Sequence, residues 1–345
     1  MDNKNKAKAS QLPPKQKQTI IFKNPPRIIG NFSIVGKSEG NGAFGEYFQC
    51  VADNDTFGEK TYEKSERIML EKAIFGAIKS AQMEPAEIDV LLSGDLLNQI
   101  ISSSFAARKF GTTFIGLYGA CSTMAESIAL GSCLIDAKYF NYISCATASH
   151  FSSAERQYRF PLELGNQRPP YSQWTVTGAG SCVLSSKGKG PKVTSVTFGK
   201  VVDFGIKDVN NMGAAMAPAA MNTIVAHLQG TQTSVSDYDL IVTGDLGRLG
   251  SEILIDLLEK NDVFLDKRYM DCGCAMYTKK HKVFMGGSGA GCSASVLNAY
   301  ILEKIKQGVY KKVLFVATGA LLSTTSSQQG DSIPCIAHAV VIEGE

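Results

Sequence analysis

The sequence feature that most constrains the fold of this 345-residue chain is an internal repeat. The segment Asp89–Leu96 (DVLLSGDL) matches Asp239–Leu246 (DLIVTGDL) at an offset of 150 residues. Two later pairs of segments match at an offset of 171 residues: Gly119–Ser122 with Ala290–Ser293, and Ala146–Thr147 with Ala317–Thr318. Three matches in the same order indicate the duplication of one structural unit, with an insertion in the second copy.

Short apolar runs alternate with helical patterns in both copies. The runs expected to form strands are 88–93, 114–118, 142–147, 181–185, 239–243, 313–318 and 336–342. The segments with helical spacing are 63–82, 97–109, 123–137, 214–229, 250–260 and 294–307. This alternation predicts an α/β protein with largely parallel sheets. We expect two duplicated halves, residues 19–190 and 191–345, and a loop over residues 36–60.

Charge is unevenly distributed along the chain. The formal net charge is +3, but residues 1–27 carry seven Lys or Arg side chains against one acid, which leaves −3 on residues 28–345. A Lys-, Gln- and Pro-rich segment such as residues 1–18 is typical of a flexible basic arm. Because the body of the chain is net negative, we expect no nucleic-acid binding.

Composition also limits the setting in which the chain works. No apolar run reaches the roughly 18–20 residues of a transmembrane helix, and residues 1–19 lack the apolar stretch of a secretory signal peptide. Nine cysteines in a chain of this length, without a signal, favour reduced thiols over a disulfide framework. Cys272 and Cys274 are the only closely spaced pair, so we expect no metal site.

Cys121 is the sharpest candidate for chemistry. It follows a predicted strand within Tyr118–Thr123 (YGACST), and the spacing of Thr123 and Glu126 fits a capping box at the start of the next helix. A thiol at a helix N-terminus is expected to favour the thiolate. The alternative is that Cys121 is a small apolar filler, and the residues alone leave both readings open.

An acyl-transferring cysteine also needs a base and an oxyanion hole. His150 is the best base candidate because it follows the strand 142–147 at its carboxyl end, which is the same sheet edge as that of Cys121. His338 lies within the last strand, where a neutral core histidine is the alternative. The loop 286–291 (GGSGAG) opens a helix, and its N–H groups could hold a carboxylate or phosphate; close helix–sheet packing is the alternative there.

Charged side chains near these segments extend the candidate site. Arg156 and Arg159 lie three residues apart after His150 and suit a carboxylate ligand. Ordinary salt bridges are the alternative for either arginine alone. Asp95 and Asp245 each follow a strand and a Ser/Thr-Gly pair, so each is either a helix cap or a ligand contact.

The order of these motifs resembles the thiolase superfamily, which includes thiolases and ketoacyl synthases. A closer resemblance, over about residues 19–343, is to a family of thiolase-like sporulation proteins of the spore's dipicolinic acid channel system. The phrases that carry it are Ser93–Gln99, Tyr118–Thr123, Ala154–Arg159, Met212–Ala220, Asp271–Gly273 and Ala317–Ser323. The resemblance implies a thiolase-like fold, in which two duplicated α/β halves form mostly parallel five-stranded sheets and share buried helices.

The chain departs from the condensing enzymes where their catalytic partners are expected. Their His-containing motif is replaced here by Gly244–Gly250 (GDLGRLG), and their second His or Asn by Gly287–Gly289 (GSG). Cys121 thus keeps the place of the nucleophile without the partners that activate it, which implies a non-catalytic protein. The alternative is a ketoacyl-synthase-like acyltransferase that uses Cys121, with His150 or His338 as base.

The resemblance further implies a ligand and a setting. The ligand is dipicolinic acid (pyridine-2,6-dicarboxylate), with no cofactor except Ca²⁺ carried with the ligand. The implied role is uptake into the developing spore and release at germination, peripheral to the forespore or spore inner membrane, with other channel membrane subunits as partners and a homodimer as the assembly. The ligand-binding candidates are Cys121, Ser122, His150, Arg156, Arg159, Asp245, Arg248, Asp271, Gly287, Ser288 and His338.

Overall fold

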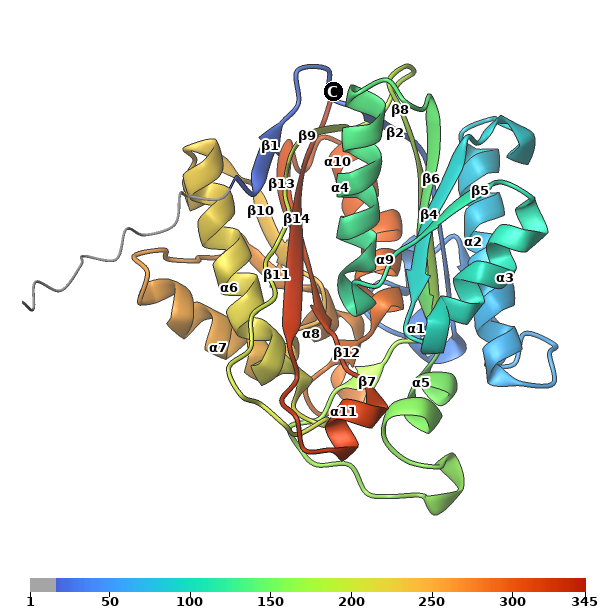
Figure 1. Cartoon of the computed structure of the whole chain (residues 1–345), viewed down its shortest axis with the longest axis vertical. Helices are drawn as coiled ribbons and strands as arrows, with labels where there is room; N and C mark the ends of the chain where they lie inside the picture. Colours follow the sequence, from blue (N-terminus) through green and yellow to red (C-terminus); the bar gives the residue numbers. More distant parts are fainter. Residues whose placement is uncertain (1–16) are drawn as a thin grey trace, which may run out of the picture.

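The computed structural model describes residues 17–345, so nearly all of the predicted basic arm, residues 1–18, lies outside the described residues (Figure 1). Within them, Gln18 donates from Nε2 to the Phe198 carbonyl oxygen at 3.0 Å. The first strand, β1 (Thr19–Ile21), pairs antiparallel with β9 (Lys192–Thr197). In residues 17–345 no helix is both long and apolar enough to cross a membrane.

The strands form one large sheet whose order divides into two equivalent sets of five. The first set runs β5 (Thr113–Gly116), β4 (Val90–Asp95), β6 (Tyr142–Ser149), β8 (Gly178–Ser185) and β2 (Arg27–Val35). The second runs β11 (Tyr269–Asp271), β10 (Leu240–Thr243), β13 (Lys312–Ala320), β14 (Cys335–Glu343) and β9. The inner strands β2 and β9 meet at one position, Arg27 with Lys192.

Strand directions repeat in the same way. β4 is parallel to β5 and β6, as β10 is to β11 and β13. β8 and β14 run antiparallel to both of their neighbours, so four of the five strands in each set share one direction. The predicted mixed α/β fold with mostly parallel strands is therefore confirmed.

Helices form three layers with these two sets of strands (Figure 1). α2 (Tyr62–Ser80) and α3 (Ile101–Phe110) cover one outer face, and α6 (Met212–Thr231) and α7 (Gly247–Glu259) cover the other. Between the two sets of strands lie α4 (Thr123–Asp136) and α9 (Ala290–Val296). Helix α9 continues through a π-helical turn at Leu297–Ile301 into α10 (Leu302–Lys306). The predicted helix 294–307 is thus one helical run interrupted by a π turn.

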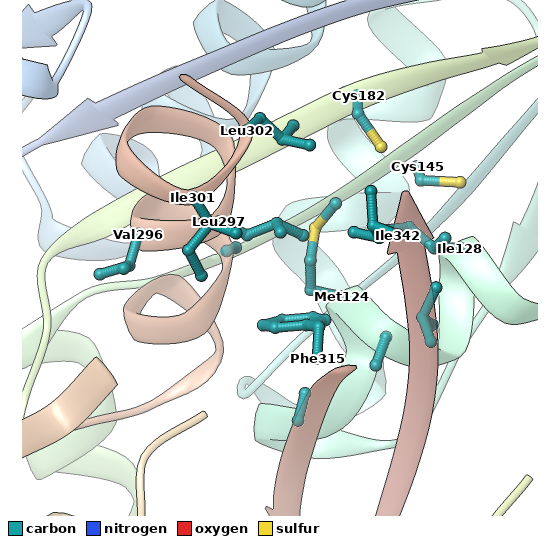
Figure 2. Packing of buried hydrophobic residues seen from close by; sticks show 14 of the residues in the cluster. Met124, Ile128, Cys145, Cys182, Val296, Leu297, Ile301, Leu302, Phe315 and Ile342 are labelled. Atoms are coloured by element: carbon teal, nitrogen blue, oxygen red, sulfur yellow. The ribbon is translucent and has the colours of Figure 1, made fainter. Parts of the chain in front are cut away.

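The central layer forms the core between the sheets (Figure 2). Met124 and Ile128 of α4 pack with Leu297 from the other central helix and with Phe315 and Ile342 from the second set of strands. All five side chains are at most 1% exposed. Each fully buried side chain of this size contributes about 1.5–3 kcal/mol. Both halves therefore depend on one core.

Equivalent polar contacts support the duplication. Oδ2 of Asp89 accepts hydrogen bonds from the Asn141 and Tyr142 N–H groups at 2.7 and 2.9 Å. Oδ2 of Asp239 accepts from the N–H groups of Lys311 and Lys312 at the same two distances. The repeat in the sequence thus corresponds to a repeat in the hydrogen bonding at the start of β4 and β10.

The structure departs from the predicted elements in several places. The helix expected over 97–109 begins at Ile101, because Gln99 and Ile100 adopt left-handed φ angles of 57° and 47° that interrupt it. The predicted loop 36–60 contains α1 (Lys37–Gly40) and β3 (Cys50–Val51). Strands β2, β9 and β11 were not predicted, since Gly30 and Asn31 interrupt the apolar pattern of β2, polar residues interrupt that of β9, and β11 has only three residues.

Candidate functional site

A cavity of about 360 Å³ lies where the two halves meet, at the carboxyl ends of the parallel strands. The first half supplies the ends of β4 and β5, the turn at Cys121 and the helix α5 (Phe151–Tyr158). The second half supplies the start of α6, the loop before α9 and the end of β13. Its lining residues are Asp95–Ile100, Tyr118, Ala120, Cys121, Ala154, Tyr158, Arg159, Thr175, Met212, Met216, Ser288, Gly289 and Ala320–Leu322.

Cys121 sits in a tight turn before α4. The turn is a 3-10 helix over Ala120–Ser122, and Ala120 has a left-handed φ of 51°. The Ser122 hydroxyl donates to the Gly119 carbonyl oxygen at 2.7 Å, so Ser122 closes the turn and does not line the cavity. A Cβ at Gly319 would lie 2.1 Å from the Gly119 carbonyl oxygen, so only a glycine at position 319 lets β13 pass this close to the turn.

Asp245 lies behind Cys121 and is fully buried. Its Oδ1 accepts from the Thr318 hydroxyl at 2.8 Å, and its Oδ2 accepts from the Gly289 N–H at 2.8 Å and the Ser288 hydroxyl at 3.2 Å. Burial raises the pKa of Asp245 to about 6, although these hydrogen bonds oppose the shift. A carboxyl group, and not an imidazole, is therefore the titratable partner of Cys121.

The surroundings of Cys121 oppose the thiolate form that its place before α4 was expected to favour. Burial raises the pKa of the Cys121 thiol well above its usual value, and the negative charge of the nearby Asp245 carboxyl raises it further. The Gly289 N–H and the Arg159 charge oppose this shift without reversing it. A thiol in such surroundings is a poor nucleophile.

Arg159 is the cation of the cavity wall. Its side chain is 7% exposed and pairs with Glu155, which also binds Nη2 of Arg168 at 2.7 Å. The buried Nε of Arg159 has no hydrogen-bond partner among residues 17–345. Arg156, one turn away, is exposed, lies 4.0 Å from Glu63 and does not line this cavity. The structure thus separates the two arginines that the sequence left equivalent.

The histidines proposed as bases lie away from Cys121. His150 caps α5: its Nδ1 accepts from the Ser152 N–H at 3.1 Å, and its Nε2 donates to the Asp55 carbonyl oxygen at 2.7 Å. His338 accepts at Nδ1 from the Gly199 N–H at 3.3 Å, and burial lowers its pKa to about 4. Neither lines the cavity, so the structure contradicts their recruitment as base for Cys121.

The glycine-rich loop does not offer the free N–H groups expected of it. The Gly289 N–H is bound to Asp245, and the Gly291 N–H donates to the Ser149 hydroxyl at 3.0 Å. Gly287 lies in β12 (Gly287–Ser288), which pairs with β7 (Trp174–Thr175); Ser288 lines the cavity and Gly287 does not. The loop therefore supports the wall of the cavity through these hydrogen bonds, and the N–H groups of Gly289 and Gly291 are not free to bind a ligand.

Two further candidates lie outside the cavity. Asp271 caps α8 (Cys272–Met276) through the Cys274 N–H at 2.9 Å and also accepts from the N–H groups of Leu246 and Gly247. Arg248 is exposed on α7. Neither residue lines the cavity.

Several lining residues were missed by sequence reasoning. Tyr158 donates its hydroxyl to the Leu96 carbonyl oxygen and forms the wall beside Arg159. Met212 and Met216 come from the start of α6. Their signal was present, because Tyr158 lies inside Ala154–Arg159 and both methionines inside Met212–Ala220.

Similarity to solved structures defines the class of the fold. Xanthomonas campestris OleA matches with a TM-score of 0.61 at 12% identity, covering 94% of this chain and 99% of that chain. Human mitochondrial 3-ketoacyl-CoA thiolase in complex with CoA matches with a TM-score of 0.58 at 12% identity, covering 96% and 100%. The 3-oxoacyl-(acyl-carrier-protein) synthase III of Aquifex aeolicus matches at 0.57 and 13%, covering 92% and 99%. The fold is thiolase-like.

Sequence similarity assigns the family within this class. Residues 16–343 match the family model described as stage V sporulation protein AD (SpoVAD). The chain is also 41% identical over 327 residues to the stage V sporulation protein AD of Bacillus subtilis (strain 168), which covers 95% of this chain and 97% of that relative. The chain therefore belongs to the stage V sporulation protein AD family and is a sporulation protein with a thiolase-like fold.

Proposed function

We propose that this protein binds dipicolinic acid in the cavity beside Cys121 without transforming it. The observation that carries the proposal is Arg159, which lines the cavity and whose buried Nε lacks a hydrogen-bond partner within the described chain. A buried guanidinium donor without a partner costs free energy until an anion binds it. A carboxylate ligand would satisfy this group.

The other lining residues suit a flat ring. Met212, Met216 and Leu322 supply apolar surface to the cavity, and Ser288 supplies a polar side chain. A cavity of about 360 Å³ with apolar walls and a few polar groups is typical of a small-molecule site. Dipicolinate is a planar dianion, so one carboxylate would contact Arg159 while its ring packs against the methionines.

Calorimetry with matched arginine variants tests this proposal. Arg159→Gln should weaken dipicolinate binding at least about tenfold, because it removes a charged hydrogen-bond donor from the wall. Arg156→Gln is the control and should bind like the wild type, because Arg156 lies outside the cavity. Pyridine-3-carboxylate, which cannot chelate, should bind more weakly than dipicolinate, and repeating the titrations with Ca²⁺ shows whether the ligand carries that ion. Equal heats for both ligands, or equal losses in both variants, would refute the proposed site.

We also infer that the protein is not an acyltransferase. Its cysteine is buried near a carboxyl group, and the two histidines considered as bases are engaged elsewhere, one as a helix cap and one in the core. Losing the base that activates a nucleophile removes several orders of magnitude in rate. Incubation with acyl-coenzyme A followed by intact-mass measurement is the test: a stable adduct that Cys121→Ser abolishes would overturn this inference.

The family supports a proposal for the cellular role. We propose that binding serves dipicolinic acid uptake into the developing spore, within the inner-membrane channel system also used at germination, and that other channel membrane subunits are the partners. Spores that carry folded Arg159→Gln protein should then contain less dipicolinic acid than Arg156→Gln spores. Equal dipicolinic acid contents in the two kinds of spore would mean that binding at Arg159 does not serve uptake.

Assembly and membrane attachment are proposals of the same kind. We propose a homodimer, supported by the edge strand β5, whose Ile115 is 37% exposed, and light scattering of the purified chain tests it. We propose peripheral attachment through the basic residues 1–27, where each basic residue near an anionic surface is worth about 1 kcal/mol. Equal co-sedimentation of full-length and arm-deleted protein with anionic liposomes would exclude that role for the arm.

A further inference from the structure

A second cavity of about 380 Å³ lies on the other side of Glu155 from the first. It is formed by the start of α5, the segment 160–174 and the loop 282–284, none of which the proposed function uses except through Glu155. Four aromatic rings line it: Phe151, Phe160, Trp174 and Phe284. Phe151 and Trp174 are stacked, with ring centroids 3.9 Å apart.

Two cations face this aromatic wall. The Arg168 guanidinium lies 4.7 Å from the Trp174 ring centroid and 5.0 Å from that of Phe151. Lys282 is exposed at the mouth of the cavity. Glu155 is the only acid among the lining residues, so the cavity carries a net positive charge. Aromatic rings with cations beside them favour a flat anionic ligand, because its ring can pack on the aromatic rings while its negative charge pairs with the cations.

Two residues that line this cavity each carry a buried polar atom without a partner. The Ser172 hydroxyl and the Gln173 Oε1 belong to residues that are each 3% exposed, and neither atom has a hydrogen-bond partner in the described part of the chain. Gln173 is held in place by its Nε2, which donates to the Asp245 and Gly287 carbonyl oxygens at 2.7 and 2.8 Å. A buried hydroxyl left unpaired is costly, which points to a ligand acceptor at this position.

We propose that the second cavity binds a planar aromatic carboxylate, with its carboxylate between Arg168, Lys282 and the Ser172 hydroxyl and its ring against Phe151 and Trp174. This site goes beyond the dipicolinate site and does not depend on it. The two cavities share Glu155, which bridges Arg159 on one side and Arg168 on the other. If a bound carboxylate replaces Glu155 as the partner of one of these arginines, Glu155 is left to pair with the other arginine alone.

The chain contains its own reporter for this site, because Trp174 is its single tryptophan. Isophthalate (benzene-1,3-dicarboxylate), a planar probe without a ring nitrogen, should quench Trp174 fluorescence saturably when added to the full-length protein. Lys282→Glu should weaken this response about tenfold through charge reversal at the mouth. Lys280→Glu is the matched control: it reverses an equally exposed charge two residues away that does not line the cavity, and it should stay within about twofold of wild type.

Ser172→Ala should weaken the isophthalate response about tenfold while leaving the fold intact, since the hydroxyl has no partner to lose. The absence of saturable quenching would overturn the proposal, as would equal losses in the two lysine variants. An equal response to cyclohexane-1,3-dicarboxylate would overturn the requirement for a planar ring. Failure of dipicolinate calorimetry with the Trp174 response intact would refute only the first site.

Discussion

Asp95 and Asp245 occupy equivalent positions in the two halves, each following a strand and a glycine, yet they serve different ends. Asp95 accepts from the Leu97 and Ser103 N–H groups at 2.9 and 2.8 Å, so its bonds stay within its own half. Asp245 binds Gly289 and Thr318 of its own half but also faces Cys121 of the other. Duplication thus supplied two buried carboxyl groups at the site between the halves: Asp95 lines the cavity, whereas Asp245 lies behind the cavity wall near Cys121.

The largest expected difference between the halves is steric. A Cβ at Gly94 would lie 2.1 Å from the Leu117 carbonyl oxygen, whereas a Cβ at Gly244, the matching position, would lie 3.2 Å from the nearest atom. Gly94→Ala should therefore destabilise the protein by about 3 kcal/mol and Gly244→Ala by about 1 kcal/mol. Urea unfolding measures both, and equal losses would mean that the two strand ends are packed alike.

The next comparison should show equality. Asp89 and Asp239 make the same pair of backbone hydrogen bonds at the same distances. Replacing either with alanine should cost about 1–2 kcal/mol, because two N–H groups lose a charged acceptor. If the losses, again measured by urea unfolding, differ by more than about 1 kcal/mol, these contacts are not energetically equivalent and the correspondence is only geometric.

The smallest effect concerns pH. Burial raises the pKa of both Asp95 and Asp245 to about 6. A carboxyl whose pKa is higher in the folded than in the unfolded state binds more protons when folded, so the free energy of unfolding falls as pH rises through the interval from about 4 to about 6. Between about pH 5 and pH 7, each group should remove about 1 kcal/mol of stability.

The matched variants Asp95→Asn and Asp245→Asn should each flatten this dependence by a similar amount. Only Asp245→Asn should also speed alkylation of Cys121 by iodoacetamide, because it removes the carboxyl that raises the thiol pKa. Peptide mass spectrometry follows the modified cysteine. Equal alkylation rates in the two variants would show that Asp245 has no influence on Cys121.

Much of the fold could be predicted from local patterns, because the repeat and the alternation of strands and helices are written in contiguous segments. The site could be predicted less well. The protonation of Cys121 depends on Asp245, which is distant in sequence, and the role of His150 depends on the Asp55 carbonyl in a segment expected to be loop. Arg156 and Arg159 could not be told apart, since only the packing of α5 decides which one is buried.

The shared central layer has a consequence for how the chain is made. α4 belongs to the first half in sequence, but it packs against β13 and β14, which are synthesised much later. A nascent first half therefore leaves the ribosome with the apolar face of α4 uncovered, a condition that favours aggregation or capture by chaperones. The duplicated halves are thus not independent folding units, and the last strand to be translated completes the core of the first.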